Sequence, residues 1–131
     1  MDSPARAWRE FGQRYRLEAA ACSACGAVSY PPRSVCPKCR GREFSSVVLP
    51  RRGKVVTSTV VRVPPAGFAD QSPLPIALIE LENGVRTMLQ IADVVDLERL
   101  DPGLDVRLEF RRVRSDGEAG VILYGHKAVP T

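Results

Sequence analysis

The stretch 22–39, CSACGAVSYPPRSVCPKC, decides the fold of the N-terminal part of the chain because it holds every cysteine in the sequence. They form two C-x-x-C pairs with ten residues between them: Cys22, Cys25, Cys36 and Cys39. Two such turns supply the four sulfurs of a tetrahedral metal site, with metal–sulfur bonds of about 2.3 Å. Gly26 and Gly41 follow the pairs and permit tight turns that aim backbone N–H groups at the sulfurs. The spacing predicts one zinc ion per chain, and iron is chemically possible with the same ligands.

The role expected for this metal is structural. Four cysteine ligands leave no coordination position for water or substrate, so the metal should not catalyse. Residues 19–45 are poor in apolar side chains, and metal binding should therefore supply folding free energy to this segment. Disulfides are the alternative use of the cysteines. No secretory signal is visible, so we expect reduced thiols and a cytoplasmic location.

The composition fits an ordinary globular protein. The 131 residues correspond to one domain or two very small ones, with 44% hydrophobic and 26% charged residues. No uncharged run is suited to span a bilayer, so we expect no membrane association. Residues 1–52 contain ten Lys and Arg against four Asp and Glu, whereas residues 53–131 contain nine against eleven. The basic part could face phosphate, in nucleic acid or in a nucleotide-bearing cofactor, or it could be a solvated surface.

Residues 3–17 are predicted to form a helix. Ser3 can cap its N-terminus, and Pro4 suits the first helical position. Aromatic side chains then recur on one face at positions i, i+3 and i+7, namely Trp8, Phe11 and Tyr15. This stripe either packs on its own chain or anchors a partner protein.

From Gly53 onward the sequence has the two-residue period of β-strands. Strands are predicted over 54–63, 76–82, 85–91, around 106–111 and over 121–129. Asn83-Gly84 predicts a hairpin turn, and residues 93–100 indicate a short helix or turn. Phe110 falls on the apolar side of its alternating strand, so we expect it in the core. Five strands with one short helical connection predict a small closed barrel, an OB-fold, with a small sandwich as the alternative.

Two connections complete this prediction. Residues 64–75 contain four prolines and a glycine, which predict a long exposed loop because proline cannot donate to a strand ladder. Asp116-Gly117 opens the connection to the last strand. We therefore expect a mainly β chain in three segments: an N-terminal helix over 1–18, a metal-binding segment over 19–46 and the barrel over 47–131.

The order of these motifs carries a family resemblance. An aromatic helix precedes two cysteine pairs, the run YPPR at 30–33 stands before the second pair, and the strand GKVVTSTVV at 53–61 leads to the proline-rich loop and the hairpin. This order resembles the DUF35 family, in which a rubredoxin-like zinc ribbon is joined to a five-stranded OB-fold barrel. The resemblance covers nearly the whole chain, and every metal ligand is present.

The resemblance implies a non-catalytic accessory subunit. DUF35 proteins associate with thiolase-superfamily enzymes, including thiolases such as benzoylsuccinyl-CoA thiolase, hydroxymethylglutaryl-CoA synthases and aldolases. The partner carries the nucleophile, whereas the small subunit scaffolds the complex and helps to shape the acyl-CoA site. By this resemblance the chain itself should lack turnover, and its partners are a thiolase-superfamily enzyme and acyl-CoA.

Particular residues are candidates for these two roles. The aromatic stripe of Trp8, Phe11 and Tyr15 is the candidate partner interface. The loop 64–75, which carries Phe68, is stiffened by proline and would lose little entropy on lining an acyl-CoA pocket. The candidate cations for the phosphates of CoA are Arg33, Arg51, Arg52 and Lys54. Each of these cations can also be a solvated charge.

The sequence itself offers no catalytic constellation. His126 is the only histidine, all four cysteines are assigned to metal, and serines such as Ser58 have no visible base partner. The alternative function is a nucleic-acid-binding module, because zinc ribbons and OB-folds both bind nucleic acids. Residues 53–131 have only three aromatic residues for base stacking, Phe68, Phe110 and Tyr124, and a net charge of −2. The sequence therefore favours a protein partner over nucleic acid.

Overall fold

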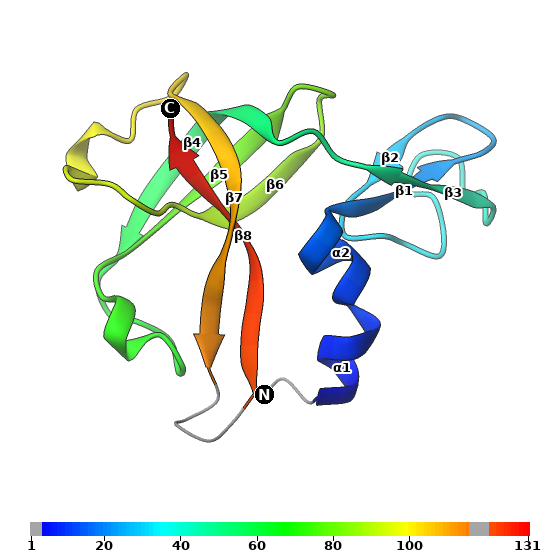
Figure 1. Ribbon diagram of the computed structural model, residues 1–131. Helices are drawn as coiled ribbons and strands as arrows, with labels where there is room; N and C mark the ends of the chain where they lie inside the picture. The colour runs from blue at the N-terminus through cyan, green and yellow to red at the C-terminus, as the bar shows by residue number, and fades with distance from the viewer. Residues whose placement is uncertain (1–3, 116–120) are drawn as a thin grey trace. The chain divides into compact units, whose positions relative to one another are not determined.

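The computed structural model describes residues 4–115 and 121–131 (Figure 1). The predicted cap Ser3 and the predicted turn Asp116-Gly117 lie outside these residues. The chain divides into two compact units after Pro50. The first unit contains the helices and the cysteine segment, and the second contains the barrel. The first unit ends just after its last strand, which extends to Val48.

The N-terminal segment forms two short helices in place of the predicted single one. Helix α1 spans Pro4–Arg9 and helix α2 spans Phe11–Arg16, with Glu10 between them at φ −92° and ψ 8°. Helix-type backbone hydrogen bonds join Glu10 to both helices, because Glu10 N–H donates to the Arg6 carbonyl and Arg14 N–H to the Glu10 carbonyl, both at 3.0 Å. Gly12 lies in the first turn of α2 and lowers the helix propensity of this short segment.

The cysteine segment forms a three-stranded antiparallel sheet. Its strands are β1 (Glu18–Cys22), β2 (Val28–Ser29) and β3 (Phe44–Val48), in the order β2-β1-β3. Leu17 adopts the left-handed conformation at φ 54° and ends α2, so that the chain turns directly into β1. The register pairs Glu18 with Val48 and Cys22 with Phe44.

The second unit is the predicted five-stranded sheet. Its strands are β4 (Arg52–Val61), β5 (Leu74–Leu81), β6 (Arg86–Gln90), β7 (Asp105–Ser115) and β8 (Ile122–Pro130), in the order β6-β5-β4-β7-β8. The hairpin at Asn83-Gly84 is confirmed: Gly84 has φ 86°, and the Asn83 side chain accepts from Val85 N–H. The predicted turn at 93–100 contains a 3-10 helix, η2 (Leu97–Arg99).

Contacts between the two outer strands nearly close this sheet into a barrel. Ile91, just after β6, forms a parallel bridge with Ala128 in β8, and Ala92 N–H donates to the Ala128 carbonyl at 2.8 Å. The outer strands of the sheet therefore meet, which excludes the sandwich alternative. The buried apolar side chains of this unit are aliphatic: Val55, Leu74, Ala77, Ile79, Leu81, Ile91, Leu100, Val106, Leu108, Leu123, Ala128 and Val129.

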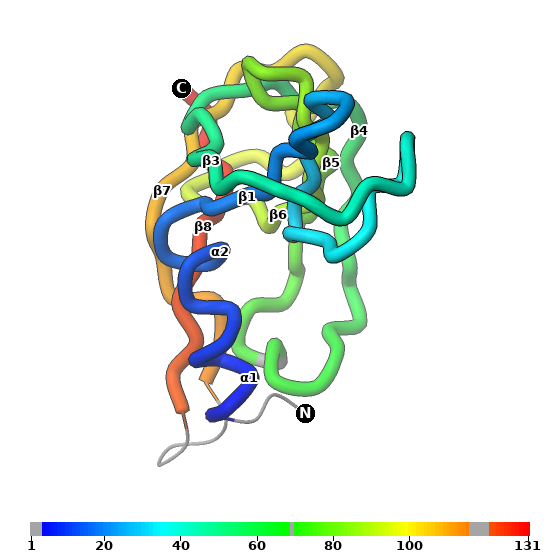
Figure 2. Tube along the Cα trace, turned by 90° about the vertical axis from the view of Figure 1, so that its right-hand side faces the viewer, coloured from blue at the N-terminus to red at the C-terminus, as the bar shows by residue number. Residues whose placement is uncertain are grey.

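The strands β7 and β8 continue beyond the barrel as a two-stranded arm. Strand β4 pairs with β7 only as far as Arg107, whereas β7 and β8 stay paired to Ser115 and Ile122. Figures 1 and 2 both show the two strands side by side along this length. The prediction that Phe110 lies in the core is wrong: the residue is 44% exposed, because it lies on the arm, past the last pairing between β4 and β7.

The proline-rich connection is a loop, but it ends earlier than predicted. It covers residues 62–73 and contains the 3-10 helix η1 (Ala69–Gln71). Pro75, which we expected in the loop, lies in β5 opposite Val60. It is the second residue of that strand, and its carbonyl accepts from Ile91 N–H at 3.0 Å. Proline is tolerated at a strand start, where a missing donor costs little.

Candidate metal centre and docking surface

The two cysteine pairs form turns of the same geometry. In the first, Gly26 N–H donates to the Cys22 carbonyl at 2.9 Å, and in the second Arg40 N–H donates to the Cys36 carbonyl at 2.9 Å. The donor residue has a positive φ in both turns, 76° at Gly26 and 62° at Arg40. We expected glycine to serve each turn, but arginine occupies this position in the second turn.

Gly41 does not supply the positive φ of the second turn, but its N–H points at the Cys39 sulfur, as expected. A Cβ atom at this residue would lie 3.3 Å from the Cys39 sulfur and 3.4 Å from the Cys22 sulfur. The backbone therefore approaches the sulfur cluster so closely that a side chain would press on it. Packing against the metal ligands therefore favours glycine at this position.

The four sulfur atoms lie where a tetrahedral metal ion needs them. All four are within 4.8 Å of one another. The sulfurs of Cys22 and Cys39 are 3.5 Å apart, and those of Cys25 and Cys36 are 3.6 Å apart. A tetrahedron with metal–sulfur bonds of 2.3 Å has edges of about 3.8 Å. A disulfide needs about 2.05 Å, so the cysteines are free thiols. The donor set fits a thiophilic ion such as zinc.

The backbone tunes these sulfurs unequally. The N–H groups of Cys39 and Lys38 point at the Cys36 sulfur and lower the pKa of that thiol to about 6. The Cys22 thiol also has a lowered pKa, because the N–H groups of Cys25 and Ala24 point at its sulfur. These donors stabilise the negative charge that a metal-bound thiolate carries.

Cys39 behaves in the opposite way. The Gly41 N–H lowers the pKa of its thiol, but the neighbouring sulfurs of Cys22 and Cys25 outweigh that donor and raise the pKa to about 12. Four thiolates this close repel one another, so the cluster retains protons until a cation takes their place.

The predicted aromatic stripe is present on α1 and α2. Trp8 is 78% exposed, and its ring centroid lies 6.0 Å from that of Phe11. Phe11 stacks on Tyr15 at 4.1 Å, and the Arg16 guanidinium lies 5.4 Å from the Phe11 ring. The three aromatic side chains therefore form a continuous row, which we call the aromatic face, with its most exposed member near the N-terminus.

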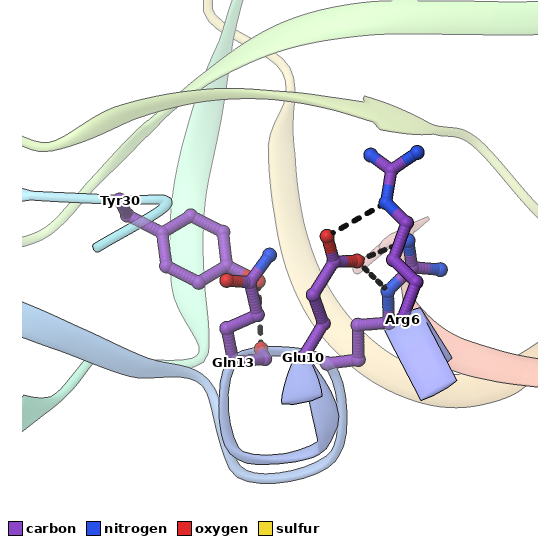
Figure 3. Close-up of polar contacts among 5 residues, drawn as sticks. Arg6, Glu10, Gln13 and Tyr30 are labelled. Carbon is purple, nitrogen blue, oxygen red and sulfur yellow. Dashed lines mark hydrogen bonds and ion pairs between the residues drawn. The ribbon is translucent and has the colours of Figure 1, made fainter. Parts of the chain in front are cut away.

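Polar contacts hold the segment that carries the aromatic face (Figure 3). The Glu10 carboxylate accepts from Arg6 Nε at 3.0 Å and from Arg14 Nη2 at 2.6 Å. Burial alone would raise the pKa of Glu10, but the two guanidinium groups hold it below its usual value. On the other side of α2, the Tyr30 hydroxyl donates to the Gln13 carbonyl at 2.8 Å. Burial raises the pKa of Tyr30, which keeps its phenol protonated as a donor.

The candidate CoA cations belong to both units of the chain. Arg33 lies exposed between the cysteine pairs, and Arg51 is exposed at the start of the second unit. Arg52 and Lys54 line an open cavity of about 560 Å³ at one end of the barrel. The cavity also contains acidic side chains, Glu80, Glu82 and Asp105. Lys54 Nζ lies 3.5 Å from the carboxylate of Asp105, so its charge is already partly balanced.

Phe68, in the loop 62–73, contacts the β7–β8 arm. Its ring lies 5.9 Å from the Arg114 guanidinium on the β7–β8 arm. Nearby, Gln71 donates to the Val113 carbonyl at 2.8 Å and accepts from Lys127 Nζ at 3.1 Å. The loop is thereby attached to the arm by side chains that sequence reasoning did not select. No local pattern marks these contacts, because the partners lie more than 40 residues apart.

The side chains of His126 and Ser58, in the second unit, contact groups of the fold itself. His126 is buried on β8, and its ring stands edge-on to Phe110 with centroids 5.8 Å apart. The Ser58 hydroxyl donates to the Leu100 carbonyl at 2.7 Å. None of the described helices has the length and apolar character needed to cross a bilayer.

Comparison with known proteins identifies the two parts of the chain. Residues 9–45 match the family described as the rubredoxin-like zinc ribbon domain of ChsH2, and residues 46–111 match the C-terminal OB-fold domain of ChsH2. A DUF35 domain-containing scaffold protein from Methanocaldococcus jannaschii is 45% identical over 126 residues, which cover 95% of this chain and 89% of that protein. The chain belongs to the DUF35 family.

Further relatives of this DUF35 chain include enzyme subunits. The benzoylsuccinyl-CoA thiolase subunit BbsA from Thauera aromatica is 31% identical over 127 residues, covering 97% of this chain and 81% of the subunit. The solved structure titled Ltp2-ChsH2(DUF35) aldolase contains a chain that superimposes with a TM-score of 0.74 at 25% identity, covering 99% of this chain and 96% of that chain. The predicted DUF35 resemblance and the predicted fold are thus confirmed.

Proposed function

We propose that this DUF35 chain is a non-catalytic accessory subunit, which scaffolds a thiolase-superfamily enzyme and helps to form its acyl-CoA site. The observation that carries the proposal is the 45% identity, along nearly the full length, to a protein named as a DUF35 scaffold. The likeness to a thiolase subunit and to an aldolase structure points to the class of partner. The chemistry of the site agrees, because the four cysteines that could have served as nucleophiles are grouped as metal ligands.

The aromatic face is the proposed contact with the partner enzyme. The Trp8 indole is 78% exposed and adjoins the ring of Phe11, and an exposed apolar patch of neighbouring side chains is typical of a protein-binding surface. Tryptophan and tyrosine are common anchors in protein interfaces, where they fill pockets near the centre. Trp8 is therefore the first residue of this face to test.

The loop 62–73 is the proposed contact with acyl-CoA. Its attachment to the arm through Gln71 and Phe68 means that it is ordered before any ligand binds. A preordered loop loses less entropy when it lines a pocket. Arg51 and Arg52 are exposed cations at the start of β4 and could pair with the phosphates of CoA.

The decisive experiment measures thiolysis or condensation by the co-purifying enzyme, with and without this subunit. We expect the enzyme alone to lose most of its activity, the subunit alone to have none, and the mixture to recover it. Full activity of the enzyme without the subunit, or turnover by the subunit alone, would overturn the proposal.

Two sets of variants divide the proposal into docking and ligand binding. Trp8→Ala should weaken complex formation at least tenfold, whereas the control Val95→Ala, which truncates a fully exposed valine of the barrel, should not. Phe68→Ala and the pair Arg51→Ala/Arg52→Ala should raise the KM for acyl-CoA in the assembled complex. The control pair Arg86→Ala/Arg99→Ala removes two exposed cations from other strands and loops and should leave this KM unchanged.

A further inference from the structure

The two N-terminal helices are too short to be stable by themselves. Helices α1 and α2 have six residues each, and neither contains a buried residue. Isolated helices shorter than about 12–15 residues are marginal in water, because few hydrogen bonds offset the cost of nucleation. The order of this segment must therefore come from what holds it to the zinc ribbon.

The ribbon holds α2 at two points. The Tyr30 hydroxyl, just after β2, donates to the Gln13 carbonyl at 2.8 Å (Figure 3). At the end of α2, the carbonyl of Leu17 accepts from Leu49 N–H at 3.0 Å, and both leucines are almost completely buried. The first contact fixes the body of the helix, and the second fixes its end.

Helix α1 is linked to α2 through Glu10. The carboxylate of Glu10 bridges Arg6 in α1 and Arg14 in α2, at 3.0 Å and 2.6 Å. Trp8 lies on α1, so its position depends on α2, and through α2 on the ribbon.

Both anchors depend on the metal centre. Tyr30 lies in the segment between the two cysteine pairs, so its position is set when both pairs close on one ion. The buried apolar residues of the first unit are few and mostly small, namely Leu17, Ala19, Ala20, Cys22, Cys36 and Leu49. Two of these are metal ligands. A core of this size is insufficient without the metal–sulfur bonds.

We infer that metal binding switches the docking surface on: the ion orders the ribbon, and the Tyr30–Gln13 hydrogen bond transmits that order to the helices that carry Trp8. The inference rests on the proposed function, since it assigns a regulator to the proposed docking surface. In the metal-free chain the aromatic face belongs to an unordered segment, and a partner must order that segment at an entropic cost. Metal-free subunit therefore binds its partner more weakly than metal-loaded subunit.

The test is hydrogen exchange of the amides of residues 4–16 in the full chain, without a partner. The amides of β5 serve as the internal reference. Removal of zinc with a chelator should bring residues 4–16 to the rates of an unstructured segment, and adding Cd²⁺, which also prefers four thiolates, should restore their protection. Equal protection in the loaded and metal-free chains would overturn the inference.

A Tyr30→Phe variant tests whether the Tyr30–Gln13 hydrogen bond transmits the order of the ribbon to α2. It keeps the ring but removes the donor, so at full metal occupancy the amides of α2 should exchange about five- to tenfold faster. The control Ser58→Ala removes a similar side-chain-to-backbone hydrogen bond from the barrel, at 2.7 Å, and should leave residues 4–16 unchanged. If Tyr30→Phe retains zinc poorly, the measurement is made with the site saturated by Cd²⁺. Unchanged exchange in the saturated variant would remove Tyr30 from the route and overturn the inference.

These readouts separate the inference from the proposed function. If hydrogen exchange of residues 4–16 does not change on metal removal, and the enzyme still needs the subunit, the coupling of metal to the helices is rejected and the accessory role is retained. Metal-dependent exchange with an enzyme that works fully alone would reject the accessory role and retain the coupling.

Discussion

Gly41 shows how closely one residue is tied to the metal centre. Its backbone lies against two ligand sulfurs, and a methyl group there would sit 3.3 Å and 3.4 Å from them. Sulfurs held by a metal ion cannot move aside without lengthening their bonds. We therefore predict that Gly41→Ala lowers zinc affinity by about 10- to 100-fold, the range found for changes around metal ligands. Competition with a chromophoric chelator measures this change.

The control for this prediction is Gly84→Ala. Gly84 has φ 86° and open space around its Cα, so alanine there should cost the barrel hairpin about 1 kcal/mol through backbone strain. Zinc affinity should not change. Equal zinc affinity in Gly41→Ala and the native chain would contradict the packing argument.

The unequal thiols predict proton release when metal binds. At pH 7 the Cys36 thiol, with a pKa of about 6, is mostly ionised, whereas the Cys39 thiol, with a pKa of about 12, is protonated. A metal ion needs both as thiolates, so binding should release at least one proton, and affinity should rise with pH. The dependence should steepen as the pH falls through about 6, where Cys36 also takes up a proton. Calorimetry in buffers of different ionisation enthalpy counts the protons, and a buffer-independent enthalpy would contradict the prediction.

Among the elements, the loop 62–73 is hydrogen-bonded to the β7–β8 arm by the side chain of Gln71. Gln71 bonds both Val113 and Lys127, and burial lowers the pKa of that lysine. Gln71→Ala removes both hydrogen bonds, so we predict a loss of about 1–2 kcal/mol in barrel stability and faster exchange of the loop amides. Denaturant unfolding and hydrogen exchange measure these effects. The neighbouring variant Ser72→Ala loses only an exposed hydrogen bond to Arg62 and should be nearly neutral; equal effects of the two would contradict the prediction.

The elements also show which features the sequence could predict. The cysteine turns and the Asn83-Gly84 hairpin are local, so spacing and turn chemistry were enough. Each predicted end of the strands at 54–63, 76–82, 85–91 and 121–129 lies within two residues of the end observed, because the two-residue period is also local.

Features that depend on distant neighbours could not be predicted in this way. Alternation places Phe110 on the side of Val106 and Leu108, but the sequence does not show that the β7–β8 arm extends past β4. The bonds from Gln71 to Val113 and from Tyr30 to Gln13 likewise join positions with no common pattern. The prediction of Phe68 and the arginines as CoA contacts remains a proposal.

At the scale of the whole molecule, the two units are held by different forces. The second has an aliphatic core that includes Ile79, which is completely buried, whereas the first depends on its metal ligands. We predict that chelation unfolds residues 4–48 and leaves the barrel protected from hydrogen exchange. Trp8 is the only tryptophan, so its fluorescence reports on the first unit alone.

The matching variant for the second unit is Ile79→Ala. It should lower the free energy of barrel unfolding by about 2–5 kcal/mol and leave zinc affinity unchanged. One cooperative transition that responds equally to the chelator and to Ile79→Ala would contradict this division.

The closure of the barrel limits how other proteins can recognise it. Where Ile91 meets Ala128, the outer strands of the sheet cover each other's backbone groups. A neighbouring polypeptide therefore cannot extend the sheet there by adding a strand, which is a common route both to peptide recognition and to uncontrolled aggregation. A protein that binds this stretch of the barrel must therefore contact the side chains on the barrel surface. Surface substitutions can then change the binding specificity while the fold stays the same.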